Sequence, residues 1–123
     1  RRVGELMDIM LDRGARRVYW VGMPIMAERW RDSRMRTIDK LFAAEAEARP
    51  GVMHIDIRAL FADADGRYVA RWRGRDGVHF ETAGWRRLGK RVYRYVRADW
   101  LPATAAPSAS PSASPKASAG APG

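Results

Sequence analysis

Asp76 and His79 are the two residues whose types and spacing could carry out acid–base chemistry. Gly77 and Val78 separate them. A histidine acts as a base at neutral pH when a carboxylate accepts the proton of one ring nitrogen and leaves the other nitrogen free. Because Gly77 makes a tight turn sterically easy, one turn can bring both side chains together. The pattern predicts two members of a nucleophile–histidine–acid triad.

The third member of such a triad, the nucleophile, has no clear candidate in the sequence. Ser33 falls in a predicted helix or in the loop that leads to it. The other serines lie after residue 102, and there is no cysteine. The chain does not begin with methionine. We therefore expect it to be the C-terminal part of an enzyme whose first part supplies the nucleophile.

The elements that must position the pair follow from the hydrophobic pattern. Apolar residues three and four apart predict helices, and short β-branched and aromatic runs predict strands. An Asp65–Gly66 turn signal precedes a short hairpin or loop that leads to Asp76. Alternating helices and strands predict an α/β fold with parallel strands between helices. The predicted helices are 3–13, 28–48 and 82–99, and the predicted strands are 17–22 and 52–57.

The turn that holds Asp76 and His79 comes directly before the last predicted helix. Reactive groups of α/β sheets gather where strands end and helices begin, so the place suits a catalytic site. We expect Glu81 or Thr82 to hold the start of this helix and Gly89 to allow its close packing. Two parallel strands are too few for a stable open sheet, so further strands are expected from an upstream segment.

Composition limits the other classes of function. The net charge is +9, and 20 of the 23 basic residues are arginines. A nucleic-acid partner is disfavoured because the 14 acidic residues are interspersed with the basic ones. Six basic residues of the last helix most simply form its solvated face, with a membrane surface or a polyanion as the alternative partner. Residues 1–101 are predicted to fold, and the Ala/Pro/Ser-rich segment 102–123 to be a disordered tail.

His54 is the other histidine, and it alternates with apolar residues in a predicted strand. This context indicates a packed or hydrogen-bonded side chain rather than a metal ligand. Asp56 would share its strand face, but no third ligand is evident, so no metal site is predicted. Without cysteine, disulfides and thiolate metal sites are excluded.

The segment from Asp76 to Gly84 is similar to the last conserved block of the SGNH (GDSL-like) hydrolases, where Asp-x-x-His supplies the acid and the base. It most resembles a bacterial branch of unknown function. The runs Tyr-Trp-Val-Gly-Met-Pro (19–24) and Asp-Gly-Arg-Tyr (65–68) are also similar to that branch. The resemblance covers about residues 3–101. It implies the C-terminal part of a flavodoxin-like three-layer α/β/α sandwich with a parallel sheet, incomplete in this chain.

The resemblance also implies a mechanism. His79 would be the general base and Asp76 its orienting partner, with no cofactor or metal. In the family, serine comes from an N-terminal Gly-Asp-Ser block, and a glycine and an asparagine complete the oxyanion hole. Those blocks are not in the sequence, which has no asparagine, and Glu81 stands where the family usually has threonine. The implied activity is that of a serine esterase, and the isolated chain is expected to be inactive.

A second class of function stays open beside the enzyme. The chain could be a non-catalytic SGNH-like scaffold or an envelope interaction module that uses the basic helix. For the enzyme, the expected substrate is a small acyl ester or an ester on envelope carbohydrate. A periplasmic, cell-envelope or secreted location is expected from the resemblance, the tail composition and the lack of cysteine. The oligomeric state is left open.

Overall fold

The computed structural model describes residues 2–101 of the 123-residue chain. The predicted helices and strands are confirmed, with small shifts at their ends, and the predicted tail lies outside the described residues. Between β2 and the last helix the chain forms two short 3-10 helices. The expected turn at Asp65–Gly66 lies between them, where Ala62 and Tyr68 form an isolated antiparallel bridge, and the expected hairpin or loop after it is the short helix η2. The elements are α1 (Arg2–Asp12), β1 (Val18–Val21), α2 (Arg29–Glu47), β2 (Val52–Ile55), η1 (Ala59–Phe61), η2 (Ala70–Trp72) and α3 (Thr82–Trp100).

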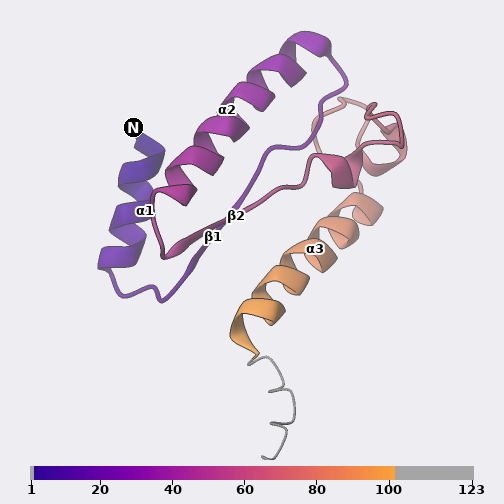
Figure 1. The fold of residues 1–123 in the computed structure, drawn as a ribbon. Helices are drawn as coiled ribbons and strands as arrows, with labels where there is room; N and C mark the ends of the chain where they lie inside the picture. The colour runs from indigo at the N-terminus through magenta and orange to yellow at the C-terminus, as the bar shows by residue number, and fades with distance from the viewer. Residues whose placement is uncertain (1, 102–123) are drawn as a thin grey trace, which may run out of the picture.

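The two strands form a parallel sheet with helices on both sides. β1 pairs with β2 in a register that runs from Val18 opposite Val52 to Val21 opposite Ile55. Helices α1 and α2 lie on one side of the strands, and α3 lies on the other (Figure 1). The predicted fold class, α/β with parallel strands between helical layers, is confirmed.

Each face of the sheet has its own apolar core, because successive strand side chains point to opposite faces. On the α1 and α2 face, Val18 and Val52 pack with Met7 and Ala46. On the other face, Ile55 belongs to a second cluster that the apolar side of α3 covers. That cluster consists of Ile25, Ile55, Ile57 and Phe61, with Leu88, Val92 and Tyr95 of α3 packed against it.

Helix α3 is held against η2 by a close approach at Gly84. A Cβ atom added there would lie 2.2 Å from the carbonyl oxygen of Trp72, so only glycine fits. The prediction that Gly89 serves this purpose was wrong, since Gly89 is exposed and a Cβ there would meet nothing within 4 Å. The α3 residues that pack on the core lie on another side of the helix.

The start and the end of α3 are also fixed. Thr82 is the first helical residue, and Glu81 at the cap makes no side-chain capping bond, so the predicted side-chain cap was wrong. Instead, the backbone amide of Glu81 donates to Trp72 O at 3.0 Å. At the far end, Asp99 accepts hydrogen bonds from Arg17 Nε (3.0 Å) and Tyr19 Oη (2.6 Å). Within residues 2–101 no helix has both the length and the apolar character needed to cross a bilayer.

Candidate active site

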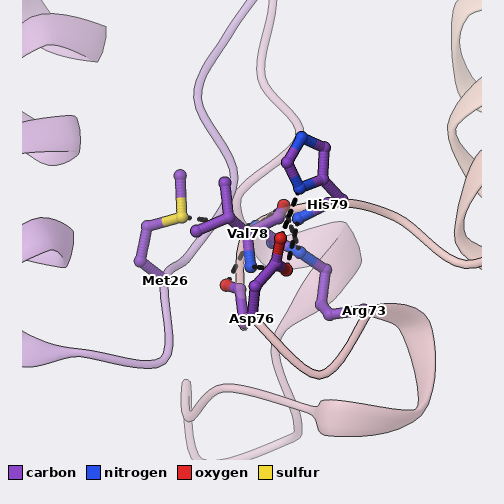
Figure 2. A network of polar contacts seen from close by, with 6 residues as sticks. Met26, Arg73, Asp76, Val78 and His79 are labelled. Atoms are coloured by element: carbon purple, nitrogen blue, oxygen red, sulfur yellow. Dashed lines mark hydrogen bonds and ion pairs between the residues drawn. The ribbon is translucent and has the colours of Figure 1, made fainter.

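The structure brings Asp76 and His79 together in the loop before α3. His79 Nδ1 is hydrogen-bonded to Asp76 Oδ2. The other carboxylate oxygen, Oδ1, accepts the backbone amides of Val78 (2.9 Å) and His79 (3.0 Å). Figure 2 shows the carboxylate between the imidazole and the loop backbone. Gly77 has a φ of 67°, a left-handed conformation that favours glycine. One side chain therefore shapes the turn and orients the ring.

The arrangement fixes which ring nitrogen can act as a base. The hydrogen bond from His79, followed by the two amide bonds, lowers the pKa of Asp76 well below its ordinary value. Asp76 is thus ionised at neutral pH and can only accept, so Nδ1 carries the proton. The His79 side chain is 83% exposed, and within residues 2–101 Nε2 makes no hydrogen bond. Nε2 is therefore open to an incoming proton donor.

Backbone hydrogen bonds close the loop around this pair. The amide of Gly74 donates to His79 O at 2.7 Å, and the amide of Gly77 donates to Gly74 O at 3.0 Å. Arg73 and Phe80 form an isolated antiparallel bridge. Asp76 and His79 thus sit on a closed turn whose two ends run side by side.

Arg73 lies beneath this turn and is almost fully buried, with 4% of its surface exposed. Its guanidinium donates to Val78 O from Nη2 (2.6 Å) and from Nε (3.1 Å). It also donates to Ile25 O from Nη1 at 2.8 Å, and Nη2 contacts Met26 Sδ at 3.2 Å. Arg73 therefore fastens the turn to the segment that follows β1 (Figure 2).

The charge of Arg73 is satisfied by carbonyl oxygens and an aromatic ring. Its guanidinium carbon lies 4.6 Å from the ring centre of Phe80. Burial lowers the pKa of Arg73. Sequence reasoning missed this residue, since nothing in the pattern separates it from the other 19 arginines. Its pairing with Phe80 across the turn becomes visible only in three dimensions.

The segment after β1 that receives Arg73 is itself fixed at the start of α2. Asp32 Oδ1 accepts the amide of Met26 at 2.9 Å. The same carboxylate binds both terminal nitrogens of Arg58, at 2.9 and 2.6 Å. These contacts, led by the bond to Arg58, lower the pKa of Asp32. The site therefore rests on a chain of contacts that reaches α2 and the segment after β2.

A second aspartate–histidine pair lies away from this turn. His54 Nε2 is 3.0 Å from Asp39 Oδ1, and that oxygen also accepts the amide of Met23 at 2.8 Å. The side chains are 15% and 16% exposed. The prediction that His54 has a packed or hydrogen-bonded side chain is confirmed. Asp56 is not its partner, since Asp56 accepts the amide of Arg58.

The space beside the turn is an open hollow of about 450 Å³. It is bordered by Asp76, Gly77 and Arg75 on one side and by Ala27 and Glu28 on the other. Ser33 lies within α2, one of the two places that the sequence allowed, and is not among the residues that line this hollow. Within residues 2–101 no cluster of three or more histidine and acidic side chains could hold a metal ion.

Comparisons with known proteins agree with this architecture. Residues 1–95 match the family described as "Protein of unknown function (DUF459)", a family of SGNH-like hydrolases. A solved structure, described as that of "a putative platelet activating factor from Streptococcus pneumonia", is similar with a TM-score of 0.62 at 16% identity. The match covers 74% of this chain and 46% of that one, so the chain spans about half the length of that structure. No curated protein matches the chain.

Proposed function

The chain belongs to the DUF459 family, and we propose that it supplies the acid–base pair of an SGNH-type serine ester hydrolase. His79 is the general base, and Asp76 holds its tautomer and stabilises the imidazolium that forms. The observation that carries this proposal is the bond from His79 Nδ1 to an ionised Asp76, with Nε2 left open to solvent. This is the arrangement that a base next to a nucleophilic hydroxyl requires.

In the proposed reaction, a serine from a segment outside this chain attacks an ester carbonyl. His79 Nε2 takes the serine proton as the new carbon–oxygen bond forms, and it returns the proton to the leaving alcohol as the ester bond breaks. Water then attacks the acyl-enzyme. His79 Nε2 takes a proton from this water and returns it to the serine as the carboxylic acid is released. Small acyl esters, including those on envelope carbohydrate, are the proposed substrates, and the periplasm or cell envelope is the proposed location.

The coverage of the structural neighbour supports a nucleophile from outside the chain, because much of that structure lies beyond the match. Sequencing the coding DNA upstream of Arg1 tests this point. An in-frame Gly-Asp-Ser block followed by a Gly-x-Asn block is the expected result. A start codon directly upstream, or another residue in place of the serine, would contradict the proposal and favour a non-catalytic scaffold.

The acid–base role is tested with the protein extended by that upstream segment, using 4-nitrophenyl acetate as substrate. His79→Ala should lower kcat/KM by at least about 10⁴-fold, because the serine then has no base. Arg71→Ala is the control, since Arg71 is an exposed residue of the neighbouring helix η2 and does not line the hollow beside the turn, and it should keep most of the activity. Full activity of the His79→Ala variant would refute the role of His79.

A further inference from the structure

Helix α3 carries a concentration of positive charge outside the candidate site. Helices α2 and α3 both have 19 residues. Helix α2 carries five basic and four acidic residues, so its charges nearly cancel. Helix α3 carries six basic residues and one acidic residue, Asp99. Most of the chain's net charge of +9 therefore resides on one helix.

These six residues share one side of α3. At 100° per residue they fall within an arc of about 140°, and they extend over about 17 Å of the helix axis. The opposite side packs on the core through Leu88, Val92 and Tyr95, so the basic side is held outward. We call this side the basic face; it consists of Arg86, Arg87, Lys90, Arg91, Arg94 and Arg97.

The charge of the basic face is not neutralised by the rest of the described structure. Among residues 2–101, none of its six side chains forms an ion pair with a carboxylate. Asp99 is already engaged by Arg17 and Tyr19, and these bonds, led by the one from Tyr19, lower its pKa. Arg87 is held against the body of the protein, since its Nε donates to Leu60 O at 2.7 Å. The other cations of the basic face are therefore available to an anionic partner.

Apolar and aromatic groups accompany the charges. Tyr93 is 64% exposed, Trp100 53% and Leu101 54%. On a helical projection Tyr93 and Trp100 fall beside the arc of the basic face. Leu101 directly follows the helix as its extended C-cap residue. Arg16 stacks on the Trp100 ring at 3.9 Å and adds one more cation. Tyrosine and tryptophan rings favour the headgroup level of a bilayer, and a hydrophilic polyanion would gain little from an exposed leucine.

Two shallow hollows beside the basic face could receive anionic headgroups. One, of about 380 Å³, is lined by Arg91, Arg94, Tyr95 and Ala98. The other, of about 180 Å³, shares Arg91 and Arg94 and adds Arg87 and Lys90. Guanidinium groups bind phosphate oxygens through paired hydrogen bonds. The hollows therefore place arginine donors where lipid phosphates could reach them.

We propose that the basic face of α3, with Tyr93, Trp100 and Leu101, binds the surface of an anionic phospholipid bilayer. The protein would lie on the bilayer with α3 roughly parallel to the surface, as interfacial basic helices do. The arginines and Lys90 contact lipid phosphates, and the aromatic rings enter the headgroup layer. This proposal does not depend on hydrolase activity, since it uses none of the residues of the candidate site.

The test is sedimentation of the 123-residue chain with vesicles, either pure phosphatidylcholine or with 30% phosphatidylglycerol, at low salt. Binding to the anionic vesicles alone is expected. The variant Lys90→Gln/Arg94→Gln/Arg97→Gln should weaken partitioning by about a hundredfold, at a several-fold loss for each basic residue removed. The matched control, Arg29→Gln/Arg34→Gln/Lys40→Gln on α2, removes the same number of exposed charges and should bind within a few-fold of the unchanged chain.

A second variant separates a bilayer from a linear polyanion. Tyr93→Ser/Leu101→Ser keeps every charge, so it should lose vesicle binding several-fold while its retention on a heparin column is unchanged. Circular dichroism checks that the variants stay folded. Three results would overturn the proposal: equal binding to both vesicle types, equal losses from the α2 and α3 charge variants, or retention on heparin without any vesicle binding.

Discussion

The protein contains two aspartate–histidine pairs whose surroundings differ. Asp76 and His79 are three residues apart on one turn, with side chains 49% and 83% exposed. Asp39 and His54 come from α2 and β2, 15 residues apart in the chain, with side chains 16% and 15% exposed. The same two residue types thus form one pair open to solvent and one enclosed between a helix and a strand.

The difference lies in what each carboxylate does with its oxygens. Asp76 uses one oxygen for the loop amides and the other for the ring, so the ring is oriented while its second nitrogen stays open. Asp39 uses a single oxygen for both His54 and the amide of Met23. A Cβ on Gly22 would lie 2.5 Å from that oxygen and 2.7 Å from His54 Nε2. The first pair leaves one ring nitrogen open, as the proposed proton transfer requires, and the second closes a junction between α2 and the sheet.

Asp76→Asn is the change with the largest expected effect. An amide can donate as well as accept, so it no longer requires the proton on Nδ1, and the ring can adopt the wrong tautomer. In the extended hydrolase proposed above, kcat for 4-nitrophenyl acetate should fall by about 10⁴-fold. The thermal midpoint should change little, because the pair is exposed. Asp39→Asn is the matched change in the other pair and should keep kcat within a few-fold. Equal losses of kcat in the two variants would contradict the proposal that only the Asp76–His79 pair takes part in catalysis.

Arg73→Met should have the next largest effect, this time on stability. Methionine has a similar length but donates nothing, so the buried carbonyls of Ile25 and Val78 lose their partner. We expect the free energy of unfolding to fall by about 3 kcal/mol, since hydrogen bonds from a charged donor are lost in a buried place. Urea denaturation followed by tryptophan fluorescence measures it. Arg71→Met at the exposed neighbour serves as control, and an equal loss there would contradict the scaffolding role of Arg73.

Asp39→Ala should lower the free energy of unfolding by a smaller amount, about 1–2 kcal/mol. It leaves the amide of Met23 and the ring of His54 without their shared acceptor in a partly enclosed place. The same urea titration measures the loss, and Asp12→Ala on the exposed end of α1 should stay within about 0.5 kcal/mol of the unchanged chain. No loss from Asp39→Ala would mean that water replaces the carboxylate fully.

The two pairs also show how far sequence could predict this molecule. Asp76 and His79 were predictable because their contact is local: they are three residues apart, and a glycine between them allows the turn that joins them. Helices and strands were predictable for the same reason, since their periodicity lies within each segment. A packed or hydrogen-bonded His54 was expected from its place in a strand. Its partner was not, because Asp39 comes from α2, and only the packing of α2 on β2 brings the two side chains together.

Close packing was the least predictable part. Both Gly84 and Gly89 lie in α3, and periodicity alone assigned the packing role to Gly89. The carbonyl of Trp72, which actually meets α3 at Gly84, belongs to a short 3-10 helix that no pattern indicated. Arg73 was missed for a similar reason, since its burial depends on carbonyl groups of its own turn and of the distant segment after β1. Such roles follow from the assembled structure and not from any single segment.

Acid titration of the Asp76 carboxyl should give the smallest of these effects. It tests whether the hydrogen bond from His79 to Asp76 is present in solution. The pKa of Asp76 lies below its ordinary value of about 3.9, first because of His79 and then because of the two amides. A lowered pKa stabilises the folded turn at pH above the unfolded value, and this contribution is lost as pH falls through the folded value. Carbon NMR of the Asp76 carboxyl should therefore give a midpoint well below 3.9. In His79→Ala the midpoint should move back toward about 3.9 without reaching it, because the largest cause is gone while the amide bonds remain. An unchanged midpoint in that variant would show that the amides alone hold the carboxylate ionised, and that the imidazole is not bound to it in solution.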